Sequence, residues 1–333
     1  MKNNKIERLK TRLSKVIEDE EELKYLRIRG SRFKQQRLPA WRPKPTMRII
    51  FIVYLFFGLV FIGIGIMLLF FSRDIQQIEI RYDKVCENKT SCSVNYTIPN
   101  DMKRPIMVYY KLKGFYQNHR RYVKSKSVTQ LYGNVETLGS ASDYSDCDPV
   151  TTNFEMRLNS STNFDNETLQ DNKVAIPCGL IAKTYFNDTF SNWTINNESC
   201  TVNEKDIAWP KDRQLFRNND NTKSLQWINM ADEHFIVWMR PAGLPDVQKL
   251  WGRIENNDLK KGDNLSFQIE NNYDVSYYEG QKAIFLSTVN TFGGKNDFLG
   301  IAYLVMGGIS ILACILFPAL YYSKNGRRKL KNK

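Results

Sequence analysis

Eight asparagines of this chain stand in the tripeptide Asn-x-Ser/Thr, which accepts N-linked oligosaccharides. All eight lie within residues 73–297, where the Asn, Ser and Thr content predicts about 3.5 such tripeptides by chance. The chemistry that they offer is glycan attachment, which predicts a heavily glycosylated luminal or extracellular domain. The acceptors are Asn88, Asn95, Asn159, Asn166, Asn187, Asn192, Asn197 and Asn264.

Five of the six cysteines lie in the same segment, and the sixth, Cys314, lies in an apolar run. No two of them have the Cys-x-x-Cys spacing of a zinc site, and the chain has only two histidines. In an oxidising compartment the expected chemistry is disulfide formation. We expect two pairs and one cysteine left over, free or bridging to another chain: Cys86–Cys92, Cys147–Cys178 and Cys200.

The sequence lacks the common patterns of enzymatic chemistry. It contains no P-loop, no HExxH or GxSxG, and no Asp-Lys-Thr-Gly phosphorylation site. His119 lies in a basic polar stretch and His234 begins an apolar one, so structural roles account for both. We expect no catalytic residue, no cofactor and no bound metal.

Two uncharged apolar runs, residues 49–72 and 298–323, bracket the glycosylated segment. Each exceeds the roughly 20 residues that cross a hydrocarbon core as a helix. Gly58, Gly63 and Gly65, and small residues from Gly300 onward in the second run, permit close helix packing. The first run is too long for a signal-peptide core, so we expect an uncleaved signal anchor.

The net charge of +13 belongs to the two ends of the chain. Residues 1–48 carry +9 and residues 324–333 carry +6, which leaves −2 for residues 73–297. Basic residues beside a span are retained on the cytosolic side, so both termini are predicted to be cytosolic tails and residues 73–297 exoplasmic. This distribution argues against nucleic-acid binding, although the tails could touch membrane lipids.

The segment between the runs is predicted to be a mainly antiparallel-β, sandwich-like domain with a minor helix. Strand patterns occur at residues 105–113, 233–240, 265–269, 275–278 and 283–288, the last three as a meander of hairpins. Apolar residues at helical spacing predict a helix at 246–254. Residues 131–223 suggest long surface loops, and residues 1–30 favour a mobile tail over a weak amphipathic helix.

Six segments of the sequence are specific enough to be compared with a known family. They are FKQQRLPAW (33–41), FYQNHRRYVKS (115–125), PCGLIA (177–182), FNDTF (186–190), FIVWMRPAGLP (235–245) and GGKNDFLGIAY (293–303). In this order they resemble the ligand-effect-modulator family, also called the cell-division-cycle-fifty family. The chain therefore resembles the accessory β-subunits of type IV P-type ATPases, the phospholipid flippases.

The resemblance implies a β-rich, disulfide-bonded ectodomain that caps the exoplasmic face of an ATPase α-subunit in a heterodimer. It implies a chain that lets its partner fold and leave the endoplasmic reticulum, for phospholipid movement from the exoplasmic to the cytosolic leaflet. The membrane could be that of the endoplasmic reticulum, Golgi, endosome or cell surface. Cys86–Cys92 matches the first disulfide region and Cys147–Cys178 the next bridge; one family bridge is missing, and Cys200 is extra.

Two regions are candidates for contact with a partner. The extended cytosolic segment 33–45 exposes Phe33, Leu38 and Trp41, which is unfavourable unless protein or lipid headgroups cover them. Arg120 and Arg121 would lie on the exoplasmic side, where they could meet acidic loops of a partner or form a solvated face.

Two other protein classes share this topology. A two-span ligand-gated channel subunit has cytosolic tails and a cysteine-rich ectodomain, but usually more disulfides, and no polar stripe lines either run here. A cell-surface adhesion protein or receptor is the other alternative, and no sequence feature favours it.

Overall fold

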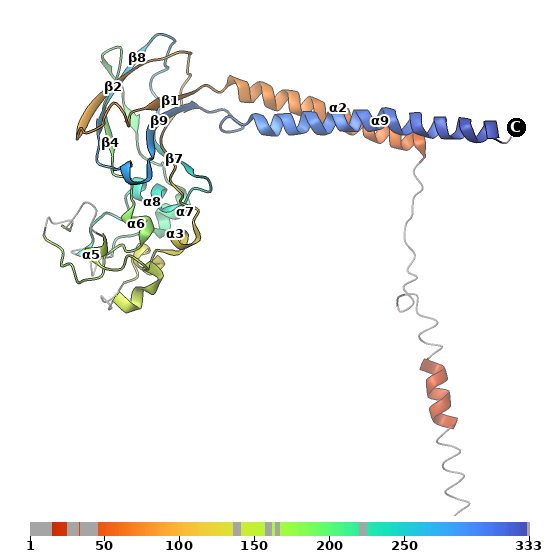
Figure 1. The fold of residues 1–333 in the computed structure, drawn as a ribbon, viewed down its shortest axis with the longest axis horizontal. Helices are drawn as coiled ribbons and strands as arrows, with labels where there is room; N and C mark the ends of the chain where they lie inside the picture. Colours follow the sequence, from red (N-terminus) through yellow and green to blue (C-terminus); the bar gives the residue numbers. More distant parts are fainter. Residues whose placement is uncertain are drawn as a thin grey trace, which may run out of the picture. The chain divides into compact units, whose positions relative to one another are not determined.

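The computed structural model of this 333-residue chain describes residues 15–24, 33, 46–135, 141–156, 162–163, 167–219 and 225–331. It divides into two compact units, residues 1–61 with 306–333 and residues 62–305. Two long helices, α2 (Met47–Asp74) and α9 (Asp297–Lys331), each contribute to both units (Figure 1). Residues 15–24 are helical and exposed, whereas the composition favoured a mobile tail.

Both long helices are apolar enough to cross a membrane, α2 over 28 residues and α9 over its first 27, Asp297–Ser323. Most of their side chains are exposed, as expected for helices whose surroundings are lipid rather than protein. The two apolar runs of the sequence therefore correspond to two candidate membrane spans.

Small residues bring the two helices together within each unit. In the unit of residues 62–305, a Cβ added to Gly65 would lie 3.0 Å from the carbonyl oxygen of Gly300. In the other unit, a Cβ on Gly58 would lie 2.6 Å from the Ile311 side chain. Gly63 has no neighbour within 4 Å, so it faces away from this packing.

The segment between the helices, here called the β domain (residues 75–296), contains two antiparallel sheets among its described residues. Sheet A has the order β1-β9-β3-β7-β6 and sheet B the order β2-β8-β4-β5. The strands are β1 Gln77–Arg81, β2 Ser91–Thr97, β3 Ile106–Lys113, β4 Thr189–Ile195, β5 Glu198–Ser199, β6 Val202–Asn203, β7 Asp246–Ile254, β8 Asn264–Glu270 and β9 Gln281–Thr288. The predicted mainly antiparallel-β fold is confirmed.

One cluster of buried apolar side chains includes residues of both sheets. Every second residue of β3 is buried, as alternation along a strand requires. Aromatic rings connect the sheets, because Phe190 of β4 packs edge-on against Trp251 of β7 at 4.9 Å. Within sheet B, Trp193 stacks on Phe267 at 4.4 Å. The core therefore lies between the two sheets.

Short helices gather beside β7 in Figure 1, away from the β2 and β8 strands. They are α3 Arg120–Lys124, α4 Val128–Leu131, η1 Ala141–Cys147, α5 Asn153–Met156, α6 Leu180–Lys183, α7 Pro210–Leu215 and α8 Glu233–Met239. The prediction of long surface loops for residues 131–223 is wrong for much of this stretch. It contributes α5, α6, α7 and strands β4 to β6, with Phe186, Phe190 and Trp193 buried.

Two neighbouring segments have conformations opposite to those predicted. Residues 233–240, predicted as a strand, form helix α8, because the Asp232 carboxylate caps it by accepting from the Phe235 N–H at 3.1 Å. Residues 246–254, predicted as a helix, form strand β7 between β3 and β6. The buried, inward Lys249 conceals the alternation of β7, and its Nζ donates to the carbonyls of Val237 and Arg240 at the end of α8.

The predicted meander near the second span is also wrong. Residues 265–269 belong to β8 in sheet B, whereas residues 283–288 belong to β9 in sheet A. Residues 275–278 form no strand, and a 3-10 turn occupies Ser276–Tyr278. The chain therefore crosses from one sheet to the other between β8 and β9.

Candidate functional site

Four of the six sequence segments singled out above converge in the β domain. The Trp238 indole N–H donates to the carbonyl oxygen of Ile181 at 2.7 Å, which joins segment 235–245 to segment 177–182. The Phe115 ring packs on Trp238 at 5.9 Å, which adds segment 115–125. Phe186, from segment 186–190, stacks on Tyr110 of β3 at 4.1 Å. Most residues named in these four segments therefore have packing or hydrogen-bonding roles inside the β domain.

A close backbone approach holds α6 against the end of α3. Gly179 has φ +105°, and a Cβ there would lie 2.2 Å from the Ser125 carbonyl oxygen, so glycine is required. The Ser125 hydroxyl donates to the Cys147 carbonyl and accepts from the Leu180 N–H, at 2.9 and 2.8 Å. The disulfide Cys147–Cys178 closes the same region.

Helix α3 presents its basic side chains to solvent. Tyr122 points inward, where its hydroxyl lies 2.7 Å from the Thr184 hydroxyl and burial raises its pKa. The exposed residues around it are the basic face, namely His119, Arg120, Arg121 and Lys124. This is where the structure places the two candidate arginines.

A groove of about 980 Å³ runs beside the basic face. Arg121 and Lys124 contribute to its lining, and so do the carboxylates Asp146 and Asp148. No ion pair joins these four side chains to an opposite charge within the described part of the chain. Their charges are therefore available to a binding partner.

Large side chains near the basic face are exposed. Tyr116, Leu244 and Tyr277 have 63%, 71% and 68% of their surface accessible. The Asn118 amide donates to the Gly243 carbonyl at 3.0 Å, which holds the Leu244 loop against the start of α3. Exposed tyrosines beside arginine resemble the composition of protein–protein contact surfaces, where aromatic residues and arginine are enriched.

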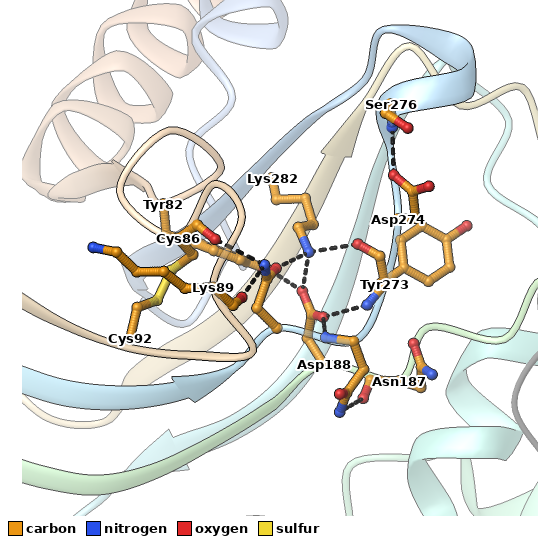
Figure 2. Close-up of polar contacts among 12 residues, drawn as sticks. Tyr82, Cys86, Lys89, Cys92, Asn187, Asp188, Tyr273, Asp274, Ser276 and Lys282 are labelled. Atoms are coloured by element: carbon orange, nitrogen blue, oxygen red, sulfur yellow. Dashed lines mark hydrogen bonds and ion pairs between the residues drawn. A yellow bond between two sulfur atoms is a disulfide. The ribbon is translucent and has the colours of Figure 1, made fainter.

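A buried ion pair joins the two sheets away from this surface (Figure 2). Lys282 of β9 lies 2.7 Å from Asp188, and both side chains are almost fully buried. The same ammonium donates to the Asn271 side chain at 2.5 Å and to the Tyr273 carbonyl at 2.6 Å. Asp188 also accepts from the Tyr82 hydroxyl at 2.8 Å, and burial raises the pKa of that phenol well above its ordinary value. No sequence pattern indicated this pair.

The ion pair also fixes the loop closed by the disulfide Cys86–Cys92. The Asn271 amide donates to the carbonyls of Cys86 and Lys89, at 3.0 and 2.9 Å. One network therefore connects the loop after β1 to the beginning of β4 and to β9.

Polar contacts anchor α2 to the start of α9 in the unit of residues 62–305. The Ser72 hydroxyl donates to Asp297 at 2.5 Å and accepts from the Asn296 N–H at 3.0 Å. The Asn290 amide donates to the Phe71 carbonyl at 2.9 Å. Asn296 and Asp297 belong to the segment 293–303, so this segment holds the junction between the helices and the β domain.

The other candidate residues are placed as follows. Phe33 is 75% exposed, and Leu38 and Trp41 lie outside the described residues. Five acceptors are exposed, Asn187 is half-buried, and Asn159 and Asn166 lie outside the described residues; the five are Asn88, Asn95, Asn192, Asn197 and Asn264.

The Cys200 and Cys314 thiols are free and buried. Among the residues that the structure describes, no group of three or more His, Cys, Asp or Glu side chains could hold a metal ion.

Comparison with known proteins gives consistent matches over most of the chain. The family model described as LEM3 (ligand-effect modulator 3) family / CDC50 family matches residues 68–327. ALA-interacting subunit 3 of Arabidopsis thaliana is 37% identical over 330 residues, covering 90% of this chain and 88% of the relative. Cell cycle control protein 50A of Mus musculus is 36% identical over 329 residues, covering 84% and 85%.

Proposed function

This chain belongs to the LEM3/CDC50 family, and on that premise we propose that it is the non-catalytic accessory subunit of a type IV P-type ATPase. The observation that carries the proposal is the match to the family model over residues 68–327, which includes the end of the first candidate span, the whole β domain and the second candidate span. The name of the relative ALA-interacting subunit 3 describes a protein that acts by association.

The proposed orientation places both termini in the cytosol and the β domain on the exoplasmic side. The basic excess of residues 1–48 and 324–333 supports it, because such residues stay on the cytosolic side of a span. The disulfides Cys86–Cys92 and Cys147–Cys178 support it too, since disulfides persist in oxidising compartments. In this orientation the eight acceptor tripeptides face the compartment where oligosaccharides are attached.

The proposed role is assembly with the ATPase, which then folds, leaves the endoplasmic reticulum and moves phospholipid to the cytosolic leaflet. The basic face, the adjoining groove and the exposed Tyr116 and Leu244 form the proposed exoplasmic contact. Unpaired arginines beside exposed aromatic side chains suit a partner loop that carries acidic residues. Phe33, with Leu38 and Trp41, remains the proposed cytosolic contact.

The test is affinity purification of the full-length chain in mild detergent, with mass spectrometry of the co-purifying proteins. A type IV P-type ATPase in near-equal amount is the expected result, followed by loss of its export and of lipid uptake when the chain is deleted. Recovery of a homo-oligomer without an ATPase, together with ligand-evoked current, would instead support a channel subunit.

A pair of matched variants tests the contact surface. Reversing the charges of Arg120 and Arg121 to glutamate is expected to lower recovery of the ATPase about tenfold or more, because each misplaced charge at an interface costs several kcal/mol. The control reverses Lys260 and Lys261, another exposed pair of adjacent basic residues on the β domain. Equal recovery with both variants would refute the proposed surface and leave the subunit role intact.

A further inference from the structure

A polar cleft of about 610 Å³ lies beside the buried ion pair of Figure 2. Its walls come from the loop after β1 and from the segment between β8 and β9. Asn271, Tyr273 and Lys282 of the buried network contribute to its lining, and its volume is typical of ligand sites, at about 300–1,000 Å³. The partner surface proposed above does not include this cleft.

One wall of the cleft contains the glycan acceptor Asn88. This residue has φ +56°, a left-handed conformation that asparagine tolerates, at a turn closed by the disulfide Cys86–Cys92. The Asn271 amide holds the carbonyls on either side of it, those of Cys86 and Lys89. The position of Asn88 relative to the cleft is therefore fixed by covalent and hydrogen bonds.

Charged and amide groups line the cleft near this acceptor. The Lys84 ammonium and the Glu87 carboxylate belong to the lining, and neither forms an ion pair with any described residue. Asn272 and Asp274 add an amide and a carboxylate from the opposite wall. Together these groups offer hydrogen-bond donors and acceptors that suit the hydroxyl and acetamido groups of a sugar.

We propose that this cleft binds the proximal N-acetylglucosamine residues of the oligosaccharide attached to Asn88. A sugar bonded to the amide nitrogen of a wall residue begins at the cleft, so its local concentration there is high. The rigid turn under Asn88 lowers the entropy lost when that sugar docks. The bound sugars cover the cleft and keep water from the Lys282–Asp188 pair. This inference rests on the proposed exoplasmic, glycosylated β domain.

Asn95 and Asn197 are natural controls. Both are exposed acceptors, on β2 and on the turn between β4 and β5, and neither lines the cleft. Oligosaccharides at these positions project into solvent, so enzymes reach them freely.

The experiment uses the full-length chain expressed in a eukaryotic host and purified in mild detergent. An endoglycosidase that cleaves between the two proximal sugars is applied to the folded protein, and release at each acceptor is followed by glycopeptide mass spectrometry. Release at Asn88 is expected to be about tenfold slower than at Asn95, a difference of about 1.4 kcal/mol of docking. The rates become equal once the protein is denatured. Replacing Lys84 and Glu87 with alanine is expected to speed release at Asn88 and leave Asn95 unchanged.

The outcomes separate this inference from the proposed function. If Asn95 and Asn197 carry glycans but Asn88 does not, the docking is overturned and the exoplasmic domain stands. The same conclusion follows if glycans are released from Asn88 and Asn95 of the native protein at equal rates. Absence of glycan at all eight acceptors overturns the proposed orientation and the docking with it.

Discussion

Replacing Lys282 with methionine tests whether the buried ion pair holds the β domain together. Methionine keeps a side chain of similar length and apolar stem, but it removes the ammonium. Three contacts are lost, to Asp188 at 2.7 Å, to Asn271 at 2.5 Å and to the Tyr273 carbonyl at 2.6 Å. Asp188 is then left without a counter-ion, at a side chain that is 0% exposed.

The expected loss is about 3–5 kcal/mol of unfolding free energy, the usual cost of removing one partner from a buried pair. The lower part of this range is expected, because Asp188 still accepts from the Tyr82 hydroxyl and from the N–H groups of Asn272 and Tyr273. For a domain of this size each 1 kcal/mol corresponds to about 2–4 °C, so a loss of about 3 kcal/mol lowers the melting temperature by about 6–12 °C.

The assay is thermal unfolding of the purified full-length chain in mild detergent, followed by fluorescence of the buried Trp193, Trp238 and Trp251. The matched control is Lys113→Met on the neighbouring region of sheet A, where the ion pair with Glu79 is one-third exposed and Lys111 also pairs with Glu79. That change is expected to cost no more than about 1 kcal/mol. Equal shifts for the two variants would refute the structural importance of the buried pair.

Three further predictions concern packing, disulfides and pH. Gly65→Leu places a side chain 3.0 Å or less from the facing helix, so it is expected to cost about 1–3 kcal/mol and to lower the yield of folded chain. The control Gly63→Leu, at a glycine with no neighbour within 4 Å, is expected to leave that yield unchanged. The disulfide Cys147–Cys178 joins residues that are 31 apart in sequence, and its removal is expected to lower the unfolding free energy by about 3–4 kcal/mol. The disulfide Cys86–Cys92 joins residues that are 6 apart, so its removal is expected to cost about 2 kcal/mol. Equal losses in denaturant titrations would contradict the account in which a disulfide acts by lowering the entropy of the unfolded chain. Hydrogen bonds from the Thr152 and Thr151 N–H groups lower the pKa of Glu155 below 4.5 in the folded chain. The contribution of Glu155 to folding stability is therefore present above pH 4.5 and is lost as the pH falls through the folded pKa. Unfolding measured over this acidic range should therefore depend less on pH in Glu155→Gln, and an unchanged profile would exclude the contribution.

Features that depend on sequence period and length were predictable. The uncharged runs at 49–72 and 298–323 coincide with α2 and the first part of α9, because twenty or more apolar residues have few alternatives to a membrane helix. The strand propensity of residues 105–113 and the alternation at 265–269 predicted β3 and β8, each of which buries one face. The mainly β fold followed from these segments.

Features that depend on distant partners were not predictable. Lys249 is inward-facing because the end of α8 accepts its hydrogen bonds, and burial lowers its pKa to about 8. This lysine at an inward position interrupts the alternation of apolar and polar residues that would have predicted β7 as a strand. Lys282 lies at a buried position of β9 for a similar reason, since Asp188, 94 residues earlier, supplies the opposite charge. Neither pairing leaves a local pattern in the sequence.

The order of strands in sheet A constrains how the chain is made. Strand β9 lies between β1 and β3, yet it is the last of the three to leave the ribosome, about 170 residues after β3. At typical synthesis rates β1 and β3 wait roughly 10–30 s for the strand that joins them. All eight acceptor asparagines precede β9 in the chain. In the proposed exoplasmic orientation, oligosaccharides attached during synthesis would therefore reach a nascent domain that is still open, including at Asn187, which is half-buried once the sheet has closed.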